Sequence, residues 1–161
     1  MCDVLENYYK RVKKDGITAA IIHKGRLLVL KRRFFPFIID PGKWEFLAGG
    51  NKRGESHDDA AYREIMEETR LRKGQLRLLV KRKNVAKMDA KRSIKYYNSF
   101  YVFASNTKEI RLDIENSRYR WASFGDISRH EDYTNVFLNE RSILKLIERA
   151  LDEEAAERKD N

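Results

Sequence analysis

The first half of the chain arranges its apolar residues in short blocks that predict β-strands. Apolar stretches at 17–23 and 27–31 predict two strands, and residues 24–26 between them predict the tight turn of a hairpin. Residues 44–47 predict a further short strand, and the glycine pair at 49–50 predicts a loop after it. This half therefore supplies strands that can pair in one sheet.

Helical spacing of apolar residues predicts three helices. A short one is expected at 3–14, and a longer one at 56–70 with Ser56 as its N-cap. The apolar positions from 140 to 151 recur as on an amphipathic helix. The polar residues 152–161 are expected to fray beyond it.

The remaining apolar blocks predict strands in the second half of the chain. These blocks are at 76–80, 94–104 and 119–122, and the second has apolar residues on both faces, which indicates a central strand. The order of elements predicts a single α/β domain with a mixed sheet (α+β) over residues 1–161, with 1–15 as an N-terminal extension.

Composition agrees with one folded domain. The chain has 161 residues, 42% of them hydrophobic, and only two prolines and eight glycines. It contains no apolar run near the ~18 residues of a membrane span, and Met1-Cys2-Asp3 lacks the features of a signal peptide. A lone Cys2 fits a reducing compartment. We therefore expect a soluble, cytoplasmic protein without membrane contact.

The positive charge of the chain is local. The formal net charge is +9, and all of it lies between Arg72 and Lys95; the other 137 residues carry 24 basic and 24 acidic side chains. An excess of this kind predicts an anionic partner such as RNA or polyphosphate, but a solvated hairpin explains it as well. The ten basic residues are Arg72, Lys73, Arg77, Lys81, Arg82, Lys83, Lys87, Lys91, Arg92 and Lys95.

Three carboxylates share one face of the predicted middle helix. At about 100° per residue, Glu64, Glu67 and Glu68 lie close together. Pairing with neighbouring arginines such as Arg63 and Arg70 would make this an ordinary charged surface. Oxygen-only clusters also suit Mg²⁺ or Mn²⁺, and a glycine-rich segment before a helix allows a phosphate to approach closely. Spacing alone leaves both explanations open.

The same segment resembles the Nudix box. The matching pattern is Gly49, five residues, Glu55, seven residues, Arg63-Glu64-Ile65, one residue, Glu67-Glu68, one residue and Arg70-Leu71. The departure is Arg70, where the family has glycine. Flanking residues resemble MutT-like nucleotide hydrolases over about 17–151. The resemblance implies the Nudix fold, an α/β/α sandwich with a loop-helix-loop catalytic motif.

The resemblance also implies roles for individual residues. Glu64, Glu67 and Glu68 match the metal-binding glutamates, and Ala48 falls where relatives offer a backbone carbonyl to the metal, Mg²⁺ or alternatively Mn²⁺. Glu55 matches an assisting glutamate, and Arg63 an arginine that orients the acids. Catalytic candidates are Glu64, Glu55, Glu115 and Arg63; metal candidates are Glu64, Glu67, Glu68, Ala48 and Glu115; substrate-binding candidates are Arg33, Gly49 and Asn139.

Several of these assignments keep an alternative. Asp113 could replace Glu115 as the additional acid, or either could be a turn residue. Arg33 could contact phosphate or simply be a charged strand end. Asn139 could recognise a purine edge or cap the terminal helix. The three histidines show no spacing of a metal site, so we expect them at the surface or in packing.

The resemblance predicts metal-dependent hydrolysis of a nucleoside diphosphate linked to another group. The first expectation is a MutT-type (deoxy)nucleoside triphosphate pyrophosphohydrolase, with oxidised purine nucleotides among its candidate substrates. Alternatives are an ADP-ribose or nucleotide-sugar pyrophosphatase, and an enzyme for dinucleoside polyphosphates or RNA 5′ ends. The basic segment raises the last alternative. A non-catalytic nucleotide- or RNA-binding module is a different class, disfavoured because all the box glutamates are present.

Overall fold

The structure, a computed structural model, describes residues 13–34, 42–89, 94–129 and 141–161. The strands are β1 (Lys13–His23), β2 (Arg26–Arg32), β3 (Trp44–Glu45), β4 (Leu47–Gly50), β5 (Leu76–Asp89), β6 (Ile94–Ser105) and β7 (Asn116–Ala122). The helices are α2 (His57–Thr69), α3 (Phe124–Arg129) and α4 (Arg141–Asp160), with a 3₁₀ turn at Lys73–Gln75.

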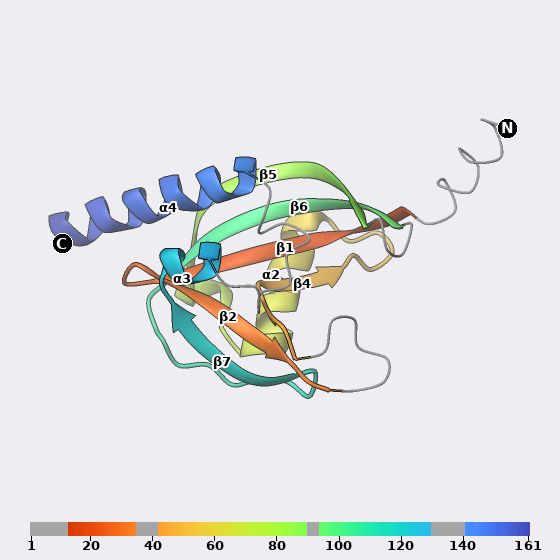
Figure 1. Cartoon of the computed structure of the whole chain (residues 1–161), viewed down its shortest axis with the longest axis horizontal. Helices are drawn as coiled ribbons and strands as arrows, with labels where there is room; N and C mark the ends of the chain where they lie inside the picture. The colour runs from red at the N-terminus through yellow and green to blue at the C-terminus, as the bar shows by residue number, and fades with distance from the viewer. Residues whose placement is uncertain (1–12, 35–41, 90–93, 130–140) are drawn as a thin grey trace, which may run out of the picture.

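The strands form one mixed sheet in the order β3-β2-β1-β6-β5. β1 and β6 pair in parallel along the centre, whereas β5 pairs with β6 antiparallel. β4 pairs antiparallel with β1, on the edge of β1 opposite to β6, and β7 pairs antiparallel with β2 (Figure 1). The expected central position of the strand at 94–104 is confirmed, because β6 has a neighbour on each side.

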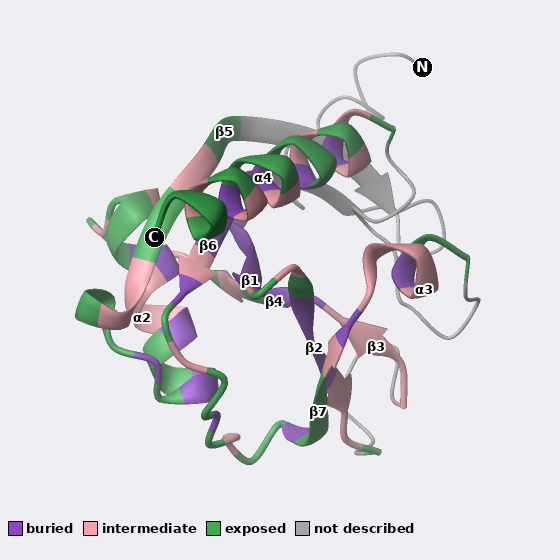
Figure 2. Cartoon of the chain, turned by 90° about the vertical axis from the view of Figure 1, so that its left-hand side faces the viewer, coloured by how far each residue is buried: buried purple, intermediate pink, exposed green. Residues whose placement is uncertain are grey.

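Apolar residues on both faces of the sheet build two separate cores. Alternate residues of β1 point to opposite faces, so Ala20 and Ile22 pack with α3 and α4, whereas Ile17 and Ile21 pack with α2. Figure 2 shows the buried part of β1 between α4 and α2, whose outer faces are exposed. The expected α/β/α sandwich and mixed sheet are confirmed.

The first hairpin forms as expected. β1 and β2 pair at His23 and Arg26, which leaves Lys24 and Gly25 as a two-residue turn. Both turn residues have positive φ, at 47° and 74°, as the twist of a tight hairpin requires.

Two predicted boundaries near the middle helix are wrong. The strand expected at 44–47 is two strands, because β3 pairs with β2 while β4 turns to pair with β1. The glycine pair expected in a loop belongs to β4, with Gly49 opposite Ile17 and Gly50 opposite Gly16. A Cβ on Gly16 would lie 2.4 Å from the Gly49 carbonyl oxygen, so the glycines permit a close pairing that apolar alternation does not reveal.

The two ends of the described chain also differ from the prediction. Lys13 and Lys14, expected in the first helix, begin β1, and the rest of that helix lies outside the described residues. The tail expected to fray is helical to Asp160. Buried Glu154 explains this, because its carboxylate accepts from the Gly25 backbone N–H (3.1 Å) and thereby ties α4 to the first hairpin. No described helix is long and apolar enough to cross a membrane.

Candidate active site

The helix α2 begins and ends at residues that determine its limits. Ser56 is the N-cap as expected, and its Oγ accepts from the Asp59 backbone N–H (3.1 Å). Asp58 and Asp59 place negative charge at the positive end of the helix dipole. Arg70 ends the helix with a left-handed backbone at φ 62°. Arginine is strained in this conformation, whereas the glycine that the family has here is not.

Arg63 gathers the acidic residues of the site. Its Nε and Nη2 donate to the two oxygens of Glu55 (2.7 and 2.9 Å). Its Nη1 donates to Glu64 Oε1 (2.7 Å) and to Glu67 Oε2 (3.2 Å), and Nη2 also donates to the Gly50 carbonyl (2.8 Å). One guanidinium therefore links three carboxylates of the box to β4.

The pairing with Arg63 strongly affects Glu55. Hydrogen bonds from Arg63 and from the Lys52 backbone N–H lower the pKa of Glu55 to about 2. The hydrogen bond to Glu55, followed by the bond to Glu64, raises the pKa of Arg63 above its ordinary value. Both partners are therefore charged at neutral pH.

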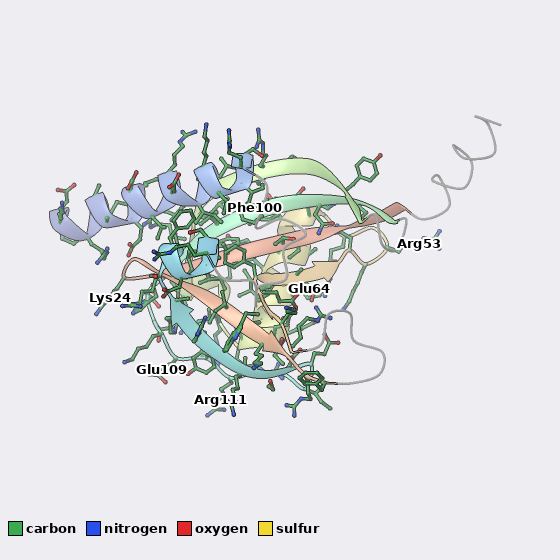
Figure 3. The ribbon with its side chains drawn as sticks, viewed as in Figure 1. Lys24, Arg53, Glu64, Phe100, Glu109 and Arg111 are labelled. Carbon is green, nitrogen blue, oxygen red and sulfur yellow. The ribbon has the colours of Figure 1, made fainter. Side chains whose placement is uncertain are left out.

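Glu64 lies against the backbone of β4. A Cβ on Gly49 would fall 2.0 Å from the Glu64 carboxyl carbon, so this position needs glycine for space rather than for an unusual φ. Burial raises the pKa of Glu64; the charges of Glu67 and Glu115 add to this, whereas Arg63 opposes it. Figure 3 shows Glu64 near the middle of the molecule, beside β4.

Glu68 is the most buried acid of the group, with 7% of its surface exposed. Its Oε2 accepts from Asn116 Nδ2 (3.2 Å), at the start of β7. Burial raises the pKa of Glu68 well above its ordinary value, and the nearby carboxylates, Asp113 and Glu45 first, act in the same direction. Both effects favour the protonated form of Glu68.

This set of oxygen ligands fits a hard divalent cation in its chemistry. In the part of the chain that the structure describes, no three acidic, histidine or cysteine side chains converge as they stand on a common metal position. Arg63 instead bridges Glu64 and Glu67 through one nitrogen. Burial raises the pKa of Glu64 and of Glu68, and neighbouring carboxylates act in the same direction, so a bound cation would stabilise the ionised form of both groups.

Arg33 holds the segment that precedes β7. Its backbone N–H donates to the Glu115 carbonyl (3.0 Å), and its guanidinium donates to the carbonyls of Ile114 (2.8 Å) and Asn116 (3.1 Å). These contacts position the residue that binds Glu68. The expected contact with a substrate phosphate stays a prediction.

Asp113 and Glu115 both lie near the buried acid. Asp113 Oδ1 accepts from the backbone and side-chain amides of Asn116 (3.3 and 3.1 Å), as in a turn, whereas the Glu115 side chain is exposed. The charges of both contribute to the raised pKa of Glu68. The structure thus brings both candidates to the site.

The other predicted positions stand as follows. Ala48 lies in β4 opposite Thr18 and is exposed, so its carbonyl role stays a prediction. Gly49 is the neighbour of Glu64 described above. Asn139 and His130 lie outside the described residues.

Sequence reasoning missed two parts of the site. Asn116 carries no spacing signal, because its partner Glu68 is 48 residues earlier in the chain. His57, expected at the surface or in packing, bonds Asp15 Oδ1 through Nε2 (2.8 Å) and Ser99 Oγ through Nδ1. Since Asp15 and Ser99 lie on β1 and β6, this histidine fastens the first turn of α2 to the sheet. His23, by contrast, bonds the Ser105 carbonyl through Nδ1 (2.9 Å) and packs against the Trp121 ring.

Comparison with known proteins agrees with this geometry. The family model described as "NUDIX domain" matches residues 13–146. A search of the curated proteins finds no match.

Similar solved structures share the fold. A MutT protein from Methanosarcina mazei Go1 is 22% identical, with a TM-score of 0.64 over 85% of this chain and 94% of that one. An Ap4A hydrolase from C. elegans is 20% identical, with a TM-score of 0.65 over 88% and 98%. A MutT NUDIX hydrolase from Burkholderia pseudomallei is 24% identical, with a TM-score of 0.64 over 83% and 96%.

Proposed function

The chain belongs to the NUDIX domain family and is a Nudix hydrolase, and we propose that it hydrolyses (deoxy)nucleoside triphosphates to monophosphate and pyrophosphate. Oxidised purine nucleotides belong to this substrate class. The observation that carries the proposal is the arrangement on α2, where Arg63 gathers Glu55, Glu64 and Glu67 in front of buried Glu68. A pure binding module has no need to retain this costly acidic set.

Glu64, Glu67 and Glu68 would hold Mg²⁺, or Mn²⁺ in its place, with the Ala48 carbonyl and Glu115 as further ligands. When bound, the cation neutralises the diphosphate and orients it for attack by water. Lys52, 3.8 Å from Glu67, lies at the exposed edge of this group.

The geometry supports different roles for the two candidate bases. Both oxygens of Glu55 accept from Arg63, so Glu55 is a poor acceptor for a water proton and serves to position the arginine. Glu64 makes a single bond to Arg63, through Oε1, so this carboxylate keeps lone pairs for a metal ion and for a proton from the attacking water. We therefore assign the base to Glu64 and the positioning to Glu55.

A nucleotide panel tests the proposal. Each nucleotide is incubated with Mg²⁺, and the products are separated and identified; the expected products are a nucleoside monophosphate and pyrophosphate. Preferred cleavage of ADP-ribose or a nucleotide sugar would replace the triphosphate assignment. No turnover of any substrate by a protein that still binds metal would favour the binding module.

A second candidate, a longer polyanionic substrate such as an RNA 5′ end or a dinucleoside polyphosphate, is favoured by the basic segment 72–95. Part of this segment is already neutralised, since Lys81 pairs with Asp58 (2.8 Å) and Arg77 with Glu157. Arg82 and Lys83, which follow Lys81 in β5, are exposed and could contact such a substrate.

Charge reversal tests this candidate. Reversing Lys81, Arg82, Lys83 and Lys87 should weaken RNA binding and reduce its salt dependence. If RNA binding, its salt dependence and turnover are all unchanged, the segment is only a solvated hairpin.

A further inference from the structure

A hollow of about 520 Å³ lies at the C-terminal end of α2, apart from the glutamate cluster. Its lining includes Thr69, Arg70, Arg72, Gln75, Glu109 and Arg111. The arginines come from two segments, because Arg70 and Arg72 follow α2 whereas Arg111 belongs to the segment between β6 and β7. Figure 3 shows Arg111 and Glu109 projecting outward from that segment.

The hollow carries an excess of positive charge. All three arginines are exposed, and the carboxylate among the lining residues is Glu109. Within the described residues, no ion pair joins Arg70, Arg72 or Arg111 to an acid, whereas Arg63 has one with each of three carboxylates. Arginines that line one hollow and form no ion pair there leave their guanidinium groups available to bind phosphate oxygens.

The backbone at Arg70 supports a role for its side chain. Arg70 has φ 62°, and among the described non-glycine residues only Lys24 shares a positive φ. Glycine would adopt this conformation with less strain, so the chain places a charged side chain here at a cost. A cation near a helix C-terminus is favourable in itself, but that effect does not account for Arg111, which lies on another segment.

The hollow is held next to the catalytic helix. The Arg111 backbone N–H donates to the Thr69 carbonyl (3.0 Å), and that of Asp113 donates to the Glu68 carbonyl (3.3 Å). The segment that carries Arg111 therefore runs along the last turn of α2, which places the backbone of Arg111 beside that of Arg70.

We propose that Arg70, Arg72 and Arg111 form a second anion site, which binds the phosphate groups of a polyphosphate chain without a metal ion. The bound phosphates come either from the far end of the substrate's own chain or from a separate polyphosphate. Binding needs neither the glutamates nor a divalent cation, so it can be tested independently of hydrolysis.

Isothermal titration of sodium tripolyphosphate into the full chain in EDTA tests the site. Arg72→Gln/Arg111→Gln should weaken binding at least about tenfold, since each lost guanidinium removes charge-assisted hydrogen bonds. The matched control Arg26→Gln/Arg118→Gln removes the same charge from exposed positions elsewhere and should bind as the wild type does. Glu67→Gln should also bind normally.

Arg70→Gly provides a second variant, which removes a charge while relaxing the backbone, and an unfolding curve recorded beside the titration shows that the variant is folded. Unchanged affinity in the arginine variants, or an equal loss in the control pair, would overturn the proposal. Turnover assays then identify the source. Competition between tripolyphosphate and the nucleotide, with a raised KM in Arg70→Gly, indicates the substrate's own chain, whereas an unchanged KM indicates a separate ligand; either result upholds the site.

Discussion

At the scale of single residues, Arg63 determines how the acidic side chains are arranged. It bridges Glu64 and Glu67 through Nη1 and holds Glu55 through two bonds. Planar, forked geometry makes this possible, since an ammonium group has the charge but cannot donate in fixed directions to several carboxylates.

Arg63→Lys should therefore fold but hydrolyse nucleotides about 10–100-fold more slowly, as is usual when a residue that orients metal ligands is lost. Steady-state rates with saturating Mg²⁺ measure this. Arg118→Lys, at an exposed position of β7, is the control and should keep wild-type rates. A rate within twofold of wild type for Arg63→Lys would contradict the assigned role.

Glu55 predicts a pH dependence of stability. Its pKa is lowered from 4.5 to about 2, so the ionised form stabilises the folded protein above pH 4.5. This contribution should shrink as the pH falls from 4.5 towards 2. Urea unfolding at several pH values should show wild type more stable than Glu55→Gln at pH 7, with the difference closing at acid pH. A stability difference between wild type and Glu55→Gln that does not change with pH would contradict this role of the ionised Glu55.

Helical spacing was enough to predict which carboxylates share one face of α2, because residues three and four apart on a helix are neighbours. It could not predict the contact of Asn116 with Glu68 or of His57 with Asp15, since those partners meet only when the sheet has formed. Arg33 illustrates the same limit, because the carbonyls that it bonds are more than 80 residues away.

At the scale of elements, the start of α2 is stabilised by its cap, whereas the end of α2 is strained. Ser56 satisfies a backbone N–H at the start, whereas Arg70 adopts a left-handed conformation at the end. Arg72, two residues later, allows a direct comparison with Arg70, because its φ of −90° is one that any residue adopts.

Arg70→Gly should raise the free energy of unfolding by about 1 kcal/mol, because it removes the left-handed strain. Arg72→Gly is the matched control and should lower that free energy by about 0.5–1 kcal/mol through the added freedom of the unfolded chain. Denaturant titrations measure both. Destabilisation by Arg70→Gly would show that its side chain makes a contact worth more than the strain.

Element types were predicted more reliably than their limits. Periodicity identified α2, the first hairpin and the central strand β6, because each buries a regular apolar face. The strand β4 contains Gly49 and Gly50, which have no side chain to show a pattern, so it was predicted as a loop. The polar composition at the end of α4 predicts fraying. The contact that stabilises this end joins Glu154 to Gly25, 129 residues apart, so local sequence does not reveal it.

At the scale of the whole molecule, opposite charges are kept in different places. The acidic cluster lies on α2 and in the segment just before β7, whereas the net charge of +9 comes from the segment 72–95. The structure places the described part of that segment on the 3₁₀ turn, on β5 and at the start of β6. Lys81 and Asp58 connect the two regions.

Removal of metal should affect stability as well as activity. The raised pKa of Glu68 means that its ionised form costs stability, and this cost grows as the pH rises above its ordinary value of 4.5. Metal-free Glu68→Gln should therefore unfold at a higher temperature than metal-free wild type at pH 7. Added Mg²⁺ or Mn²⁺ should raise the Tm of wild type and have little effect on the variant. Equal metal responses would exclude Glu68 as a ligand.

The most direct test of the account is Mg²⁺-dependent turnover by Glu67→Gln. Half of the Glu67 side chain is exposed, so the substitution leaves the core intact while removing one proposed ligand. Glu153→Gln, at an exposed position of α4, is the control. We predict a loss of at least about a hundredfold in kcat for Glu67→Gln, with unchanged unfolding in the absence of metal, and no loss for the control. Full metal-dependent activity of Glu67→Gln would contradict the assignment of the metal site to this face of α2.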